Sequence, residues 1–181
     1  MPGYPLFLKL EGERCLVFGG GKVATRKIRS LLKRGALVTC VSKDFSKAIR
    51  NWAKNTQRDQ TRGLTPFGVP LRLKRIREEK KISLNGAKLV IAATSDRDFN
   101  ARVAQVCRRK KIWVNVVDDP KLCDFYVPAV LERGPLQVAI STGGASPFFA
   151  RRLREELEKA LPASTGKMLE KLGKIREKAR R

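Results

Sequence analysis

One local pattern constrains this chain more than any other: an apolar strand, a glycine-rich turn and an amphipathic helix follow one another directly. The apolar run at 14–18 leads into GGGKVA at 19–24, which matches G-x-G-x-x-A. Apolar residues at helical spacing follow, Gly35 ends the helix, and a second apolar run occupies 36–41. This order predicts a βαβ unit of about 30 residues with parallel strands.

Each small residue of the turn has a physical role in a dinucleotide-binding unit. Gly19 permits a tight turn, Gly21 lets a pyrophosphate approach the backbone, and Ala24 lets the helix pack closely on the sheet. The pattern therefore predicts dinucleotide binding, against the alternative of a merely structural turn. An acid that holds the ribose normally follows about 20 residues on. Here Asp44 could serve, although Lys43 beside it could equally tolerate a 2′-phosphate, so NAD and NADP both stay open.

The remaining pattern alternates strands with helices and predicts an α/β fold, a Rossmann-type doubly wound parallel sheet. After residue 120 the spacing becomes too short for helical crossovers, so a different sheet topology is expected there, followed by helices that Pro162 interrupts. The expected elements are a helix at 45–52, a loop at 54–68, strands at 71–73, 87–93 and 112–117, a helix from Phe99, short strands at 125–127 and 136–140, and helices from Pro147 onward.

Composition limits the chemistry that this chain can use. The sequence contains 40 Lys and Arg against 17 Asp and Glu, a net charge of +23, which favours anionic partners. It contains no histidine, so histidine metal sites, Ser-His-Asp triads and histidine bases are excluded. A proton acceptor must then be a carboxylate, Lys, Tyr, Cys or water.

Cysteine usage points to a reducing compartment, and hydropathy points to a protein that does not span a membrane. The four cysteines have no metal-ligand spacing and are expected to be reduced packing residues, with no metal site in the protein. No apolar run approaches the roughly 20 residues that span a bilayer, and the first residues do not resemble a signal peptide. A cytoplasmic protein that does not use a membrane is therefore expected.

Several motifs in one order resemble the precorrin-2 dehydrogenase family, the N-terminal part of siroheme synthases. They are YPLFL at 4–8, VFGGGKVATRK at 17–27, AATSD at 92–96 with Asn100, NVVDDP at 115–120, FYVPA at 125–129 and ISTGGASP at 140–147. The resemblance covers nearly the whole chain except 55–85. It implies oxidation of precorrin-2 to sirohydrochlorin with NAD as hydride acceptor, in a homodimer. Some members also insert ferrous iron into the product.

The resemblance also implies site residues and an organisation of the chain. Asp118 matches the catalytic carboxylate, and it independently follows an expected strand at the sheet edge where α/β folds bind ligands. The alternatives are a turn aspartate before Pro120, or Asp119 as the base. Cofactor contacts are expected at Gly19, Gly21, Lys22, Val23, Ala24, Lys43, Asp44 and Thr94, and substrate contacts at Asn115, Ser141, Thr142, Gly143 and Arg151. The expected division is 1–113 for NAD binding, 114–146 for dimerisation and 147–181 for a helical region.

Several alternatives stay open at this point. Residues 141–144 could bind a substrate carboxylate, or Ser146 could simply cap the helix that begins at Pro147. Phe148 and Phe149 are expected in the core or in a dimer contact. Two functions other than a dehydrogenase also stay open. The charge would suit a nucleic-acid-binding module on a Rossmann-like scaffold, although no binding motif supports it. The glycine turn would also suit a non-catalytic NAD sensor.

Overall fold

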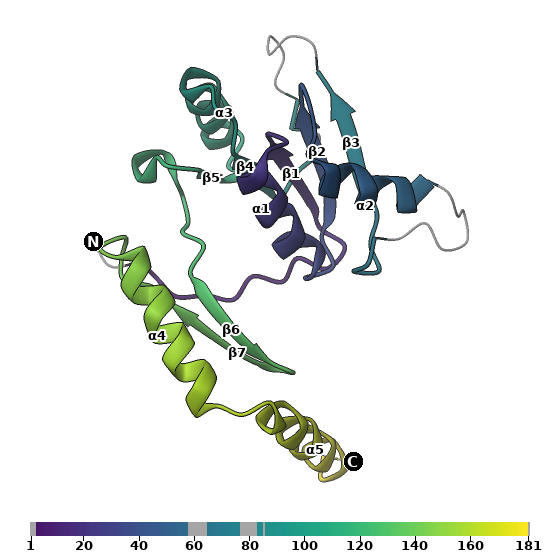
Figure 1. Ribbon diagram of the computed structural model, residues 1–181, viewed down its shortest axis with the longest axis vertical. Helices are drawn as coiled ribbons and strands as arrows, with labels where there is room; N and C mark the ends of the chain where they lie inside the picture. The colour runs from purple at the N-terminus through teal and green to yellow at the C-terminus, as the bar shows by residue number, and fades with distance from the viewer. Residues whose placement is uncertain (1–2, 58–64, 77–82, 85, 181) are drawn as a thin grey trace. The chain divides into compact units, whose positions relative to one another are not determined.

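The structure is a computed structural model that describes residues 3–57, 65–76, 83–84 and 86–180. Contacts within the chain divide it into two compact units (Figure 1). The larger unit, Pro5–Tyr126, is called the Rossmann unit below. The smaller, called the C-terminal unit, comprises Val127–Arg181 together with Met1–Tyr4.

The Rossmann unit is built on a five-stranded sheet in the order β3-β2-β1-β4-β5, with every neighbouring pair parallel. This is the doubly wound order, in which chain direction across the sheet reverses between β1 and β4. The elements of this unit are β1 (Arg14–Phe18), α1 (Lys22–Leu32), β2 (Leu37–Ser42), α2 (Lys47–Gln57), β3 (Leu71–Arg75), β4 (Leu89–Ala92), α3 (Arg97–Arg109), β5 (Trp113–Val116) and the short 3₁₀ helix η1 (Pro120–Leu122).

Side-chain alternation along the strands creates a core on each face of the sheet. Val17 of β1 packs with Ile28 of α1 and Ile49 of α2 on one face. Phe18 packs with Phe99 of α3 on the other, and the two rings meet edge to face. The helices thus lie on both faces, with α1 and α2 on one side and α3 on the other (Figure 1). Burial of both faces explains why β1 and β4 read as continuous apolar runs.

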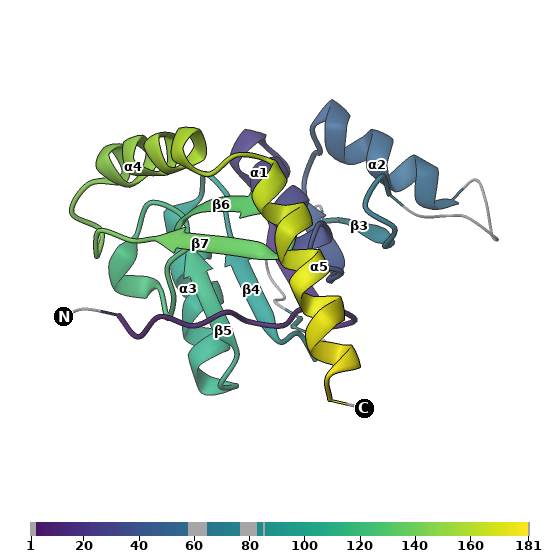
Figure 2. The same cartoon turned by 90° about the horizontal axis from the view of Figure 1, so that it is seen from below.

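The C-terminal unit is a hairpin with two helices. Strands β6 (Ala129–Arg133) and β7 (Leu136–Ile140) pair antiparallel, and helices α4 (Pro147–Ala160) and α5 (Ser164–Lys178) both contact the hairpin (Figure 2). The Arg133 guanidinium donates to the carbonyl oxygens of Glu158 and Leu161 at 3.0 Å each, which satisfies the end of α4.

The structure confirms the predicted fold class and corrects several predicted elements. The expected strand at 125–127 is wrong, because the antiparallel partner of β7 begins only at Ala129. The helix expected at 45–52 runs instead from Lys47 to Gln57, so the expected loop at 54–68 begins later, and its residues 58–64 lie outside the described part of the chain. Phe148 and Phe149 are 80% and 58% exposed, so they do not belong to the core of their unit.

Two further points concern the expected organisation. Ser146 caps α4 by accepting a hydrogen bond from the Phe149 amide at 3.1 Å, as the capping alternative predicted. The boundary expected after residue 113 falls inside β5, and the Rossmann unit continues to Tyr126. Among the described residues, no helix combines the length and the apolar character that a membrane crossing requires.

Helix α5 approaches the hairpin turn so closely that it needs a glycine at one position. A Cβ on Gly166 would stand 2.8 Å from the carbonyl carbon and oxygen of Arg133, whereas a Cβ on Gly173 of the same helix meets nothing within 4 Å. We therefore expect Gly166→Ala to be less stable than Gly173→Ala by about 1–3 kcal/mol, the usual cost of overpacking. Urea unfolding followed by circular dichroism measures the difference, and equal stability of the two variants would contradict this packing.

Candidate active site

The ends of β1, β2 and β4 meet at the glycine turn. The Gly19 amide donates to the Val41 carbonyl oxygen at 2.9 Å. Gly19 has φ +113°, a backbone conformation that residues with a side chain rarely adopt. A Cβ on Gly19 would lie 2.3 Å from the Ala93 carbonyl oxygen, directly after β4. Only glycine fits here, because the backbone after β4 occupies the space that a side chain needs.

Gly20 fits against the segment that follows β2 in the same way. A Cβ at this position would lie 1.9 Å from the Asp44 carbonyl oxygen and 2.9 Å from the Ser42 Oγ. The Gly20 carbonyl oxygen also accepts a hydrogen bond from the Ser46 amide at 2.8 Å. The turn is thereby fixed to the carboxyl end of β2.

Gly21 is different, because it faces open space. A Cβ there would meet nothing within 4 Å, and Gly21 is the N-cap residue of α1 without a side-chain cap. The first turn of α1 carries no acidic residue, whereas Asp96 caps α3 and Ser146 caps α4. The amides that begin α1 are therefore available to an external anion, which the helix dipole also favours.

The neighbouring predicted cofactor residues fall around this opening. Lys22 and Val23 are exposed at the start of α1, and Ala24 is buried against the sheet, where its small size allows close packing. Lys43 and Asp44 are exposed immediately after β2. These residues and the glycine turn thus share one edge of the parallel sheet.

Thr94 follows β4 at the same edge, and its hydroxyl is hydrogen-bonded within the protein. Its Oγ1 donates to the Asn100 Oδ1 at 2.7 Å, while the Asn100 amide nitrogen donates to the Thr94 carbonyl oxygen at 3.0 Å. Asn100 is 4% exposed and belongs to α3. The buried amide therefore holds the segment after β4 in place beside Gly19.

Asp118 follows β5 in a conformation that is unusual for a residue with a side chain. Its φ is +63°, in the left-handed region, and its side chain is exposed. Asp119 next to it has another task, because its carboxylate accepts from the Lys121 amide at 3.2 Å and caps η1. Within the described residues, the Asp118 carboxylate has no recorded hydrogen bond, so it is the aspartate of the pair that remains available to a ligand.

Cys123 holds the turn that carries Asp118. Its Sγ accepts from the Val116 amide at 3.2 Å, and its thiol lies 3.1 Å from the Val116 carbonyl oxygen and 3.3 Å from that of Asp119. Asn115 is buried at 7% exposure and donates to the Phe125 carbonyl oxygen at 2.9 Å. The Asn115 side chain, predicted to contact substrate, thus holds the segment that returns from the Asp118 turn.

Lys27 is a candidate residue that sequence reasoning missed. It lies half-buried on α1, and Val117 and Phe125 pack against the same core face as α1. Burial, with a smaller effect of Arg26, lowers the pKa of the Lys27 ammonium, while the negative charge of Asp118 acts in the opposite direction. Lys27 is therefore within electrostatic reach of Asp118. The sequence signal that could have identified it is its place at the end of the VFGGGKVATRK motif, next to the buried Ile28.

The cysteine thiols are protonated at neutral pH. Burial raises the pKa of Cys15 to about 11 and the pKa values of Cys40 and Cys107 to about 12. Burial is also the main cause that raises the pKa of Cys123. All four cysteines are free thiols, so they behave as packing residues and not as thiolate bases.

The other predicted substrate residues lie in the C-terminal unit, between β7 and α4. The Ser141 Oγ accepts from the Gly143 amide at 3.2 Å, and the Thr142 Oγ1 accepts from the Ser146 amide at 3.0 Å. Arg151 on α4 is 75% exposed on its side chain and donates to Glu155 at 2.9 Å. These hydroxyls and this guanidinium are thus hydrogen-bonded within their own unit.

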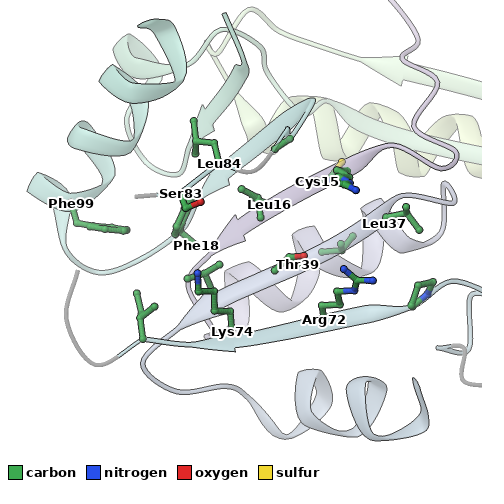
Figure 3. A pocket seen from close by; sticks show the side chains of 16 residues that line it. Cys15, Leu16, Phe18, Leu37, Thr39, Arg72, Lys74, Ser83, Leu84 and Phe99 are labelled. Carbon is green, nitrogen blue, oxygen red and sulfur yellow. The ribbon is translucent and has the colours of Figure 1, made fainter. Parts of the chain in front are cut away.

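A pocket of about 240 Å³ opens elsewhere in the Rossmann unit, on the α3 side of β1, β2 and β3 (Figure 3). Leu16, Thr39, Arg72, Lys74 and Phe99 are among the residues that line it. Apart from Phe99 of α3, these side chains rise from the face of the sheet, whereas the glycine turn and Asp118 follow the carboxyl ends of strands. Since open α/β sheets bind ligands along that edge, we place the candidate site at the glycine turn.

Two protein families match this sequence. The family described as "Putative NAD(P)-binding" matches residues 6–129, which is most of the Rossmann unit and the start of β6. The family of the central region of sirohaem biosynthesis proteins matches residues 133–160.

Individual relatives agree with these families. The chain is 43% identical to the siroheme synthase of Methylococcus capsulatus and 40% identical to that of Methylobacillus flagellatus, over 97% and 98% of its own length. It spans only 34% and 35% of those proteins, about a third. The solved structure of SirC, a precorrin-2 dehydrogenase, is 31% identical with a TM-score of 0.71, and the match covers 96% of this chain and 79% of that one.

The glycine turn offers a test that separates folding from ligand binding. Gly20→Ala forces a Cβ into the Asp44 backbone and is expected to cost about 1–3 kcal/mol of stability. Gly21→Ala is expected to cost less than about 1 kcal/mol, because its Cβ meets open space. That Cβ should nevertheless weaken NAD⁺ binding by roughly tenfold, since it obstructs the approach of the pyrophosphate.

Thermal unfolding and titration calorimetry with NAD⁺ measure the two effects separately. An unchanged NAD⁺ affinity in folded Gly21→Ala would contradict the assignment of the anion to the start of α1.

Proposed function

Because the chain belongs to the family described as putative NAD(P)-binding, we propose that it oxidises precorrin-2 to sirohydrochlorin with NAD⁺ as hydride acceptor. The observation that carries the proposal is the shared sheet edge of the glycine turn, which suits a dinucleotide, and Asp118, which suits a proton acceptor. The similar SirC structure is that of a precorrin-2 dehydrogenase, which is the same class of reaction.

The residues at the glycine turn fit a dinucleotide. The open surface at Gly21 and the uncapped start of α1 can receive a pyrophosphate, and no first-turn carboxylate repels it. We assign Gly19, Gly21, Lys22, Val23 and Ala24 to this cradle, with Lys43 and Asp44 at the ribose end and Thr94 across from them. When bound, the nicotinamide supplies the acceptor for the hydride that leaves the substrate.

We assign to Asp118 the role of accepting the proton that the substrate loses on oxidation. The chain has no histidine, and its cysteine thiols are held protonated by burial, so a carboxylate is the suitable base. The left-handed turn projects Asp118 from the end of β5, and the Cys123 contacts fix that turn. Lys27 places a positive charge within electrostatic reach of this carboxylate.

The basic surface suits the substrate that we propose. Precorrin-2 carries many carboxylates, and a net charge of +23 raises the rate of its encounter with the protein. Ser141, Thr142, Gly143 and Arg151 are the proposed substrate contacts, with Asn115 acting through the backbone that it holds. We further propose that the chain forms a homodimer in the cytoplasm, in which the exposed Phe148 and Phe149 lie at the contact.

Turnover with the authentic substrate tests the proposal. Purified protein is incubated with precorrin-2 and NAD⁺ while NADH formation and the pigment spectrum are followed, then again with ferrous or cobaltous ion to detect metal insertion. A nucleic-acid-binding module would instead bind DNA with an affinity that falls steeply with salt, and it would form no NADH. An NAD sensor would bind the cofactor without turnover.

Asp118→Asn is expected to lower the rate of NADH formation by about 10²–10⁴-fold, because the amide cannot accept the proton. NAD⁺ affinity should stay within about twofold, since the substitution leaves the glycine turn intact. Asp119→Asn is the matched control, because asparagine also caps helices well, and its rate should change little. A fully active Asp118→Asn enzyme, or a greater loss in Asp119→Asn, would remove the proposed role from Asp118.

A further inference from the structure

Helix α3 leaves part of one sheet face open. On the side opposite α1 and α2, α3 packs mainly on β4 and β5. The pocket of about 240 Å³ lies beside it, over β1, β2 and β3 (Figure 3). Its lining residues all belong to the Rossmann unit, and most of them come from these three strands. None of the described lining residues belongs to the glycine turn or to the Asp118 turn, so this pocket is a different place from the candidate active site.

Strand register arranges the lining of this pocket in two rows across the sheet. One row is Leu16, Thr39 and Arg72, and the other is Phe18, Val41 and Lys74. Each row begins with an apolar side chain on β1 and ends with a cation on β3. Alternation places both cations on this side, because Leu71 and Leu73 of β3 pack against the opposite core face. The pocket therefore has a largely apolar floor and a cationic wall.

The apolar part of the pocket is formed by side chains that are already fixed. The rings of Phe18 and Phe99 meet edge to face with their centroids 5.5 Å apart. Leu16, Val41 and Leu84 are buried in the same core on this side of the sheet. An apolar group that enters the pocket would thus contact preformed surface and remove that surface from water, which is the main source of affinity in small-molecule sites.

The cationic wall has no acid to neutralise it. None of the described lining residues is Asp or Glu. Within the described part of the chain, neither Arg72 nor Lys74 forms an ion pair, whereas Arg75, which alternation directs to the other side of the strand, lies 3.4 Å from Asp44. Arginine and lysine bind anions through charge-assisted hydrogen bonds, and their aliphatic stems cover apolar surface. The wall therefore suits an anion that is attached to an apolar body.

We propose that this pocket is a second ligand site, which binds a small aromatic anion. Its ring lies on Leu16, Phe18 and Val41, and its anionic group lies at Arg72 and Lys74. The volume of about 240 Å³ is below the roughly 300–1,000 Å³ of pockets that hold drug-sized ligands, so a ligand of one or two fused rings fits. Two cations favour a doubly charged phosphate over a carboxylate. The inference goes beyond the proposed function and does not depend on it.

Calorimetric titration of the whole chain with naphthyl phosphate tests the inference. The protein should bind this probe at least about tenfold more tightly than naphthol, which lacks the anion, and than inorganic phosphate, which lacks the ring. Saturating NAD⁺ should leave the affinity unchanged, because the pocket does not include the glycine turn. Displacement of the probe by NAD⁺ would place it at the cofactor edge and would overturn the inference.

Variants on the two sides of the sheet locate the probe. Arg72→Gln combined with Lys74→Gln should weaken naphthyl phosphate by roughly tenfold, because both charged contacts are lost. Arg75→Gln combined with Arg50→Gln is the matched control, since it removes the same charge away from the pocket, and the affinity should not change. Thr39→Phe places a ring between Leu16 and Arg72 and should abolish binding, with circular dichroism as the check that this variant is folded.

The contrary results are equally specific. An equal loss in the two double variants would show that overall charge alone attracts the probe. Unchanged binding by folded Thr39→Phe would place the probe outside the pocket. Either result, or no binding of naphthyl phosphate to the wild-type protein, would overturn the inference. NADH formation with precorrin-2 is measured without the probe, so the proposed function stands or fails independently.

Discussion

The structure depends on two places where backbone segments approach each other without room for a side chain. At Gly19 the first strand turns against the carbonyl group that follows β4, and at Gly20 the turn lies against the carbonyl group of Asp44. These contacts bring the carboxyl ends of β1, β2 and β4 to one place. Because the turn is filled by backbone alone, the next residue, Gly21, can remain open at the start of α1.

The composition then determines which chemistry this edge can support. The chain has no histidine and its cysteine thiols are kept protonated by burial, so the aspartate after β5 is the proton acceptor that we propose. A carboxylate can act as a base only if its position is fixed. Here the Cys123 thiol fixes it, because it makes hydrogen bonds to backbone atoms on both sides of the Asp118 turn. The half-buried Cys123 thus has a structural role beside the candidate base, while Lys27 supplies a positive charge from α1.

Much of the fold was predictable because both strand faces are buried and the helices are amphipathic. The glycine turn, the first two strands and the order of elements through β5 follow from local periodicity and from small residues. The prediction of a strand at 125–127 was wrong because Phe125 makes other contacts. Its side chain packs against the α1 face, and its carbonyl oxygen accepts a hydrogen bond from Asn115. The exposure of Phe148 and Phe149 was equally unpredictable, since an apolar helix face looks the same whether its partner lies within the chain or outside it.

The sequence by itself determined the class of fold, the place of the glycine turn and the absence of histidine chemistry, because these depend on residue type and on spacing along one segment. Only the tertiary structure decided which of two adjacent aspartates is available, since Asp119 caps η1 and Asp118 does not. It also decided that Asp44 meets Arg50 and Arg75, which are separated from it by 6 and 31 positions in the chain. Parallel pairing of β2 with β3 brings Arg75 to Asp44, and side-chain periodicity does not encode which distant charges a strand register brings together.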